Sequence, residues 1–323
     1  MKAKRLRFLF LAFILLIPVF AGSWGFWAHG RINRIAVFTL PKPMLGFYKS
    51  YIEHLTGHAA DADKRRFSDK DEAPRHYIDL EYYGQPYDSI PHGWNDAVAK
   101  YTVDSMKSWG IVPWHIQTIY WRLTQAFKEK DAVRILHLSS DLGHYIGDAH
   151  VPLHTTENYD GQLTGQRGIH SFWESRLPEL FGEEYDYFVG KAYYINDVPG
   201  FVWQRVIETR SALDSVLRFE HELSLQFPED KKYGYEDRNG KMVRVYTLDY
   251  SHGYHEKLNG MVERQMRRAI IALGSLWMSA WIDAGQPDLD DLINPVRSKE
   301  EEKTTDEEED LYRKGKWLGR PEE

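Results

Sequence analysis

The sequence predicts an all-α fold, organised as a single multi-helix domain. Two observations support this prediction: apolar residues recur at helical spacing over most of the chain, and only one short segment has the pattern of a β-hairpin. The chain has 323 residues, of which 42% are hydrophobic and 14% aromatic. This composition is sufficient for a packed core and disfavours a disordered chain.

Six helices are predicted from the spacing of apolar residues. In chain order, the first five are expected at residues 31–40, 43–56, 111–127, 131–149 and 201–227. The last long helix carries a stripe of apolar residues, Leu258, Val262, Met266, Ala269, Ile270, Leu273, Trp277 and Trp281. We interpret this stripe as part of the core.

Two segments depart from the helical pattern. Residues 233–250 contain Asn239-Gly240 between residues of β preference, which predicts a small surface hairpin. From residue 294 the chain becomes polar, and residues 299–310 hold eight acidic and two basic residues. We therefore expect a solvated, disordered tail at 294–323 and a folded domain at 24–293.

The first 23 residues have the pattern of a signal peptide. A basic start is followed by the apolar run 8–20, and Ala21-Gly22-Ser23 offers small residues for cleavage. The apolar run has 13 residues, too few for a membrane-spanning helix, which needs about 20. We expect export to the periplasm or the extracellular space, with cleavage after Ser23.

Charge and cysteine content restrict the class of function. The net charge is −7, and removal of the four basic residues of the presequence would make it −11. Such a chain is not attracted over long range to nucleic acids or anionic membranes. It contains no cysteine, so disulfides and a cysteine nucleophile are excluded. We also find no repeat, no glycine-rich phosphate loop and no basic patch, and nothing in the sequence indicates a protein partner.

Histidine placement is the most informative feature of the sequence. In His144-Tyr-Ile-Gly-Asp148 and in His170-Ser-Phe-Trp-Glu174, a histidine and a carboxylate are four residues apart, on one side of a helix. Pro152 ends the first of these helices, and a turn can return His154 to the same pocket. Imidazole and carboxylate are zinc ligands, so two such pairs can supply two metal ions.

One pair at this spacing is weak support, because HxxxD and HxxxE arise by chance. The compound string is more specific: His144-x3-Asp148-x-His150-x-Pro152-x-His154, with His170-x3-Glu174 following after 16 residues. Upstream lie further candidates, namely Trp24, His29, Asp61, Asp63 and His76.

Between Trp24 and Glu174 the chain resembles the superfamily of zinc-dependent phospholipases C and single-strand-specific zinc nucleases. The resemblance rests on an early tryptophan and histidine, then an aspartate and a histidine, the string HxxGDxHxPLH, and a final HxxxE. It implies a helical domain whose cleft holds three zinc ions.

The resemblance also implies which residues bind each ion. One zinc ion would be held by His154, His170 and Glu174. The second would be held by Asp61, His76, His144 and Asp148. The third would be held by His29, by Asp148 as a bridging ligand, and by the α-amine and carbonyl of Trp24 after cleavage.

Three assignments remain beside this ligand set: the choice between Asp61 and Asp63, the place of His150, and the pair His137 and Asp141. Asp61 lies 15 residues before His76 and Asp63 lies 13 before, and the first spacing fits the resemblance better. We therefore favour Asp61 as the ligand, with a further role in orienting the attacking water. His150 is not a ligand in this pattern and is expected in a second shell or at the pocket rim. His137 and Asp141 are either a second shell or plain helix surface.

Zinc has no redox chemistry, so the expected reaction is hydrolysis of a phosphodiester by a metal-activated water. By this resemblance a phospholipid is the favoured substrate. Glu174 stands where the nucleases typically carry aspartate, and the gap from His154 to His170 is short, as in the phospholipases. The acidic chain also suits nucleic acid poorly. Single-stranded nucleic acid or a nucleotide is the alternative. A zinc-binding protein without turnover is the more remote alternative.

Overall fold

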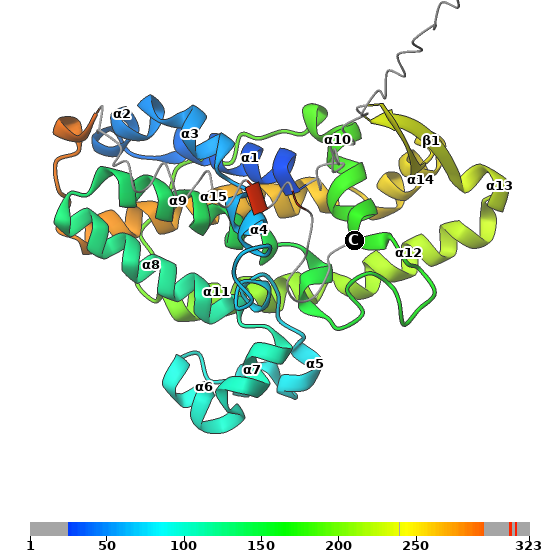
Figure 1. The fold of residues 1–323 in the computed structure, drawn as a ribbon, viewed down its shortest axis with the longest axis horizontal. Coiled ribbons are helices and arrows are strands. Elements are labelled where there is room, and N and C mark those ends of the chain that lie inside the picture. Colours follow the sequence, from blue (N-terminus) through cyan, green and yellow to red (C-terminus); the bar gives the residue numbers. More distant parts are fainter. Residues whose placement is uncertain (1–24, 239, 294–309, 312–313, 315–323) are drawn as a thin grey trace, which may run out of the picture.

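The computed structural model describes residues 25–238, 240–293, 310–311 and 314. The expected signal peptide, Trp24 and most of the acidic tail lie outside the described residues. The all-α prediction is confirmed, since the described chain is helical apart from one two-stranded sheet (Figure 1). No helix in the described part of the chain is long and apolar enough to span a membrane.

Four helices form the centre of the domain. They are α1 (Gly25–Ala36), α8 (Val112–Glu129), α9 (Ala132–Asp148) and α15 (Met261–Asp283). Helix α1 packs on α9 and α15, while α8 and α9 run side by side and both contact α15. The stripe predicted on the last helix lies in this core, with Ile270, Leu273 and Trp277 fully buried.

The segments between α1 and α8 are short. They are η1 (Val37–Thr39), α2 (Lys42–Ser50), α3 (Ile52–Gly57), α4 (Asp61–Arg65), η2 (Ala73–Arg75), α5 (Leu80–Tyr83), η3 (Tyr87–Ser89), α6 (Trp94–Tyr101) and α7 (Val103–Trp109). Helix α3 packs on α1 and α9, and η2 lies against α8. Helices α5, α6 and α7 form a lobe that projects from the lower side of the view in Figure 1.

After α9 the chain is again irregular before the long helices resume. This irregular part comprises η4 (Pro152–Thr155), the π-helical turn η5 (Ser171–Arg176), α10 (Leu177–Phe181) and η6 (Gly182–Glu184). It is followed by α11 (Val198–Arg210), α12 (Leu213–Gln226), α13 (Glu229–Lys232) and α14 (Leu248–Leu258), and η7 (Asp290–Leu292) lies after α15. Helices α11 and α12 both pack on η4 and so cover the turn that carries His154.

The hairpin prediction is confirmed. Strands β1 (Tyr233–Arg238) and β2 (Lys241–Tyr246) pair antiparallel, with Tyr233 opposite Tyr246 and Arg238 opposite Lys241. Gly240 has φ of 80°, a conformation that glycine adopts without steric cost.

Four helix predictions were wrong in detail. The helix expected at 31–40 is α1, which begins at Gly25 and ends at Ala36, and the one expected at 43–56 is divided into α2 and α3 at Tyr51. The helix expected at 201–227 is two helices, because the chain turns at Ser211 and Ala212 and the two halves pack on different neighbours, α8 and α14. Leu258 ends α14 and does not belong to α15. Between these helices, Asn259 and Gly260 have φ of 48° and 71°, which a continuous right-handed helix cannot contain.

Candidate metal centre

Helix α9 supplies the rigid part of the site. His144 and Asp148 lie one turn apart on its buried face, with His144 Nε2 at 3.3 Å from Asp148 Oδ2. The cap of the helix orders its start, since the Asp131 side chain accepts a hydrogen bond from the Arg134 amide. Both site residues are at most 2% exposed, so their positions are fixed by the packing of α9 in the core.

Glycine at position 147 lets helix α1 approach this face. A Cβ atom at Gly147 would lie 2.5 Å from the His29 ring, and a Cβ atom at Gly143 would lie 1.7 Å from Asn33 Oδ1. Neither contact is possible with a side chain present. The glycine of the string therefore has a structural reason: it makes room for His29 beside Asp148.

The remaining donors come from short segments after and before α9. His154 lies on η4 and His170 precedes η5, the π-helical turn that carries Glu174. In this turn the histidine and the carboxylate still meet, with His170 Nε2 at 2.7 Å from Glu174 Oε2. Single π-helical turns often occur at functional sites, where they shift the direction of a side chain.

Three groups of buried or nearly buried side chains can each hold a metal ion. Within each group the donor atoms lie within 4.8 Å of one another. The groups are His29, His144 and Asp148; Asp63, His76 and His144; and His154, His170 and Glu174. We call these the Asp148 group, the Asp63 group and the Glu174 group.

The Asp148 carboxylate connects two of these groups. Its Oδ1 lies 3.3 Å from His29 Nε2, whereas its Oδ2 lies 3.0 Å from His76 Nδ1 and 3.3 Å from His144 Nε2. The two oxygens thus point at donors from different groups. This is the arrangement that a carboxylate bridging two metal ions requires.

Two histidines have a fixed tautomer that suits metal binding. The Nδ1 atoms of His144 and His154 lie 3.0 Å and 2.7 Å from the carbonyl oxygens of Ala59 and His76. In the neutral ring the hydrogen is then held on Nδ1, and the Nε2 lone pair is directed into the site. The backbone thus orients these rings as the second shell of a metal site does.

The electrostatics of the site favour bound cations. Burial by itself would raise the pKa of Asp148, but the charges of His144 and His154 hold it well below its usual range. The pKa values of Asp63 and Glu174 are lowered in the same way by the histidines beside them. The carboxylates are therefore ionised at neutral pH. Conversely, Asp148 and Asp63 outweigh burial and raise the pKa of His144 to about 10.

The structure places Asp63, and not the favoured Asp61, in the group with His76 and His144. Asp63 Oδ1 lies 3.4 Å from His144 Nε2 and 3.7 Å from His76 Nδ1. Asp61 is held elsewhere, by His58 Nδ1 at 2.6 Å and Lys64 Nζ at 2.9 Å. The preference for Asp61 is corrected accordingly: both residues lie on α4, but only Asp63 is directed at α9.

Sequence reasoning missed the side chains behind His76. Glu72 is fully buried, and its Oε1 lies 3.4 Å from His76 Nε2, on the opposite side of the ring from the metal-binding donors. Tyr145 donates a hydrogen bond to the same carboxylate, and Arg75 forms an ion pair with it. The signal was available, because Glu72-x3-His76 has the same spacing as the two pairs that were recognised.

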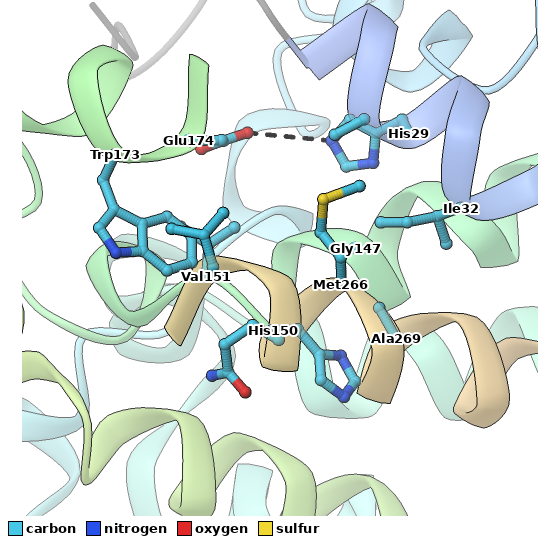
Figure 2. Close-up of a pocket in the computed structure, with 12 residues that line it drawn as sticks. His29, Ile32, Gly147, His150, Val151, Trp173, Glu174, Met266 and Ala269 are labelled. Carbon is cyan, nitrogen blue, oxygen red and sulfur yellow. Dashed lines mark ion pairs between the residues drawn. The ribbon is translucent and has the colours of Figure 1, made fainter. Parts of the chain in front are cut away.

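His150 does not join any of the three groups. Its Nδ1 lies 2.7 Å from the Ile146 carbonyl oxygen, and burial lowers its pKa to about 4. It lines a small, mostly apolar cavity of about 30 Å³ beside the site, with His29 and Glu174 on the other side (Figure 2). This location agrees with the expected place at a pocket rim. Trp24, the remaining candidate, lies outside the described residues.

No protein-family model matches the chain, and no curated protein is detectably similar to it in sequence.

Proposed function

We propose that the protein is a zinc-dependent hydrolase of phosphodiesters. The observation that supports this most strongly is the convergence of three donor groups, two of which share His144 and are linked by the Asp148 carboxylate, whose oxygens face His29 and His76. A single structural zinc site would need four ligands closed around one ion, whereas here the donors form adjacent groups of three. Adjacent ions with incomplete shells leave positions for substrate.

The spacing of the donors fits zinc. Two ligands at about 2.05 Å from one ion in tetrahedral geometry lie roughly 3.3 Å apart. In the Glu174 group, His154 Nε2 lies 3.1 Å from His170 Nε2 and 3.2 Å from Glu174 Oε2. In the Asp63 group, His144 Nε2 lies 3.0 Å from His76 Nδ1. Nitrogen atoms that face each other this closely are well placed to share one cation, and the mixture of imidazole and carboxylate is the set that zinc takes.

The residues that would hold the ions follow from these groups and from the resemblance. The first ion would be held by His154, His170 and Glu174. The second would be held by Asp63, His76, His144 and Asp148. The third would be held by His29 and Asp148, with the α-amine and carbonyl of Trp24 completing its shell after export and cleavage.

When bound, zinc would supply Lewis acidity for the phosphate oxygens and lower the pKa of a coordinated water. The protein side chains would position these parts. Asp148 would fix the separation of two ions, and the backbone bonds of His144 and His154 would keep their rings in place. We assign to Asp63 the role of orienting the attacking water, which the sequence analysis had given to Asp61. No serine or cysteine nucleophile is needed, and the chain contains no cysteine.

Among phosphodiesters we favour phospholipids. The last ligand is Glu174, where the nucleases of the superfamily that the chain resembles typically carry aspartate, and the gap between His154 and His170 is short, as in its phospholipases. The net charge of −7 also opposes long-range binding of polynucleotides.

The test uses the mature protein beginning at Trp24. Its zinc content should be close to three ions per chain, and it should hydrolyse bis(p-nitrophenyl) phosphate. The Asp148→Asn variant is the matched inactive control. Phosphatidylcholine vesicles and single-stranded DNA then separate the two substrate classes.

Each outcome has a definite meaning. Hydrolysis of phosphatidylcholine supports the proposal, whereas cleavage of DNA alone would assign the same centre to a nuclease. Three bound zinc ions without hydrolysis of any diester would mean a zinc-binding protein and would overturn the proposal. One zinc ion with full activity would contradict the trinuclear centre.

A further inference from the structure

A second cleft of about 450 Å³ is lined on α9 by Arg134, His137, Leu138, Asp141 and Tyr145, and by no member of the three metal-binding groups. Helix α4, η2, α8 and α9 each contribute to its wall. Four of its ten lining residues are arginines: Arg65, Arg75, Arg122 and Arg134. Asp141 is the one acidic residue among them. Four guanidinium groups therefore gather at one place in a chain with a net charge of −7.

The arginines keep N–H donors that their ion pairs do not use. A guanidinium carries five N–H donors. Arg65 binds Asp141 and Tyr145 through Nη2, while its Nη1 is buried and has no hydrogen-bond partner among the described residues. Arg75 is paired with Glu72 and Asp69 through Nη1 alone. Arg122 has no ion pair among the described residues.

The carboxylates that pair with these arginines lower the positive charge of the cleft, but they leave Arg65 Nη1 and the Arg122 side chain without a partner among the described residues. Asp141 is held by Arg65 at 2.8 Å and faces His137 at 3.5 Å. Glu72, Asp69 and Glu129 pair with the arginines but are not among the residues that line the cleft. A buried guanidinium N–H without a partner is costly, and an oxyanion in the cleft would satisfy it.

The size and the apolar part of the wall restrict the ligand. A volume of about 450 Å³ is that of a small-molecule site and exceeds what one bare oxyanion fills. Ile119 and Leu138 line it together with the arginines. The complementary ligand is a compact dianion joined to a small organic group.

We propose that this cleft binds a small phosphate monoester, held by Arg65, Arg75 and Arg122, at a site separate from the metal centre. Arginine suits this task because its planar fork matches two phosphate oxygens at once. The site does not depend on the function proposed for the metal centre, since its residues are not among the metal-binding groups.

The test is to titrate the zinc-loaded protein with glycerol 3-phosphate and to measure the binding by calorimetry or equilibrium dialysis. Arg122 is the residue to change, because it is exposed, has no ion pair in the described structure, and is remote from the metal ligands in sequence. Arg122→Glu should lose one binding site per chain, or weaken it at least about tenfold, since a charged hydrogen bond is removed and a repulsion added. Zinc content and hydrolysis of the synthetic diester should not change.

Controls separate this site from phosphate binding by the metals. Arg218→Glu, an exposed arginine on α12 outside the cleft, should leave the number of sites unchanged. Inorganic phosphate should bind more weakly than glycerol 3-phosphate, and glycerol should not bind. Equal stoichiometry and affinity in the wild type and Arg122→Glu would overturn the proposal. Equal affinity for glycerol 3-phosphate and inorganic phosphate would overturn the claim that the cleft recognises the organic group of a monoester. The cleft would then be a site for inorganic phosphate.

Discussion

Helix α9 carries the same sequence pair twice, and only one copy joins a metal-binding group. His137 and Asp141 are four residues apart, as are His144 and Asp148. The side chain of His137 is 56% exposed, and Asp141 is neutralised by Arg65 at 2.8 Å. His144 and Asp148 are buried and meet donors from α1, α4 and the residue after η2. The spacing brings two ligands together, but burial and convergence of other elements decide whether a metal can bind.

The difference between the two pairs is tested most strongly by the same substitution in both, asparagine for the aspartate. Asp148→Asn removes a negative charge that faces two donor groups. We expect it to lower the rate on bis(p-nitrophenyl) phosphate by at least roughly a thousandfold and to release two zinc ions. Asp141→Asn, two turns earlier, should keep the zinc content and most of the rate. Metal analysis and steady-state kinetics measure both, and a normal rate in Asp148→Asn would show that the donor groups are not the active centre.

A second comparison concerns the two aspartates of α4. Asp63→Asn should reduce activity by roughly a hundredfold or more and weaken one zinc ion, because Asp63 faces His76 and His144. Asp61→Asn should change the rate by less than about threefold, since its partners are His58 and Lys64, which belong to none of the metal-binding groups. Zinc titration of the two variants decides between them. If Asp61→Asn lowered the rate and the zinc affinity more than Asp63→Asn does, Asp61 would be the ligand.

These aspartates show where sequence analysis reaches its limit. The pairs on α9 and around η5 follow from helical periodicity, and so does the core stripe of α15, because a regular helix fixes which residues share a face. Between Asp63 and His76 the chain has no period. A spacing of 13 or 15 residues therefore does not tell which aspartate side chain faces His76. The packing of α4 on α9 determines that it is Asp63.

Two further features depend on tertiary structure alone. The turn at Ser211 and Ala212 has no glycine or proline to signal it, so the predicted helix continued through it. The basic cleft combines residues from four elements that are well separated in the sequence. A short basic run, Lys64-Arg65-Arg66, is present, but only Arg65 of this run lines the cleft, which explains why the sequence showed no patch.

The third prediction concerns Glu72, which supports His76 from behind. A carboxylate on the outer nitrogen of a metal-binding histidine fixes the ring and strengthens the ligand, and its loss costs about 10- to 100-fold in metal affinity. Glu72→Gln should show this loss in a chelator competition. Because Glu72 also pairs with Arg75, the unfolding of the metal-free variant must be measured as well. Lower stability with unchanged zinc affinity would make Glu72 a structural residue only.

The last prediction uses the protonation of His144, with His137 on the same helix as the control. In the metal-free protein, Asp148 and Asp63 outweigh burial and raise the pKa of His144 to about 10. Because the folded pKa is above the unfolded one, the stability from this charge is fully present below about pH 6.5 and is lost as pH rises through about 10. Zinc needs the neutral ring, so its uptake at pH 7.5 must displace this proton.

The consequence is a zinc affinity that rises about tenfold per pH unit for each proton released. Calorimetry in buffers of different ionisation enthalpy should detect the proton at pH 7.5. His137→Asn should leave this release unchanged, because His137 is outside the donor groups. Zinc uptake without proton release would mean that His144 is already neutral, and the electrostatic contrast between the two pairs on α9 would then be wrong.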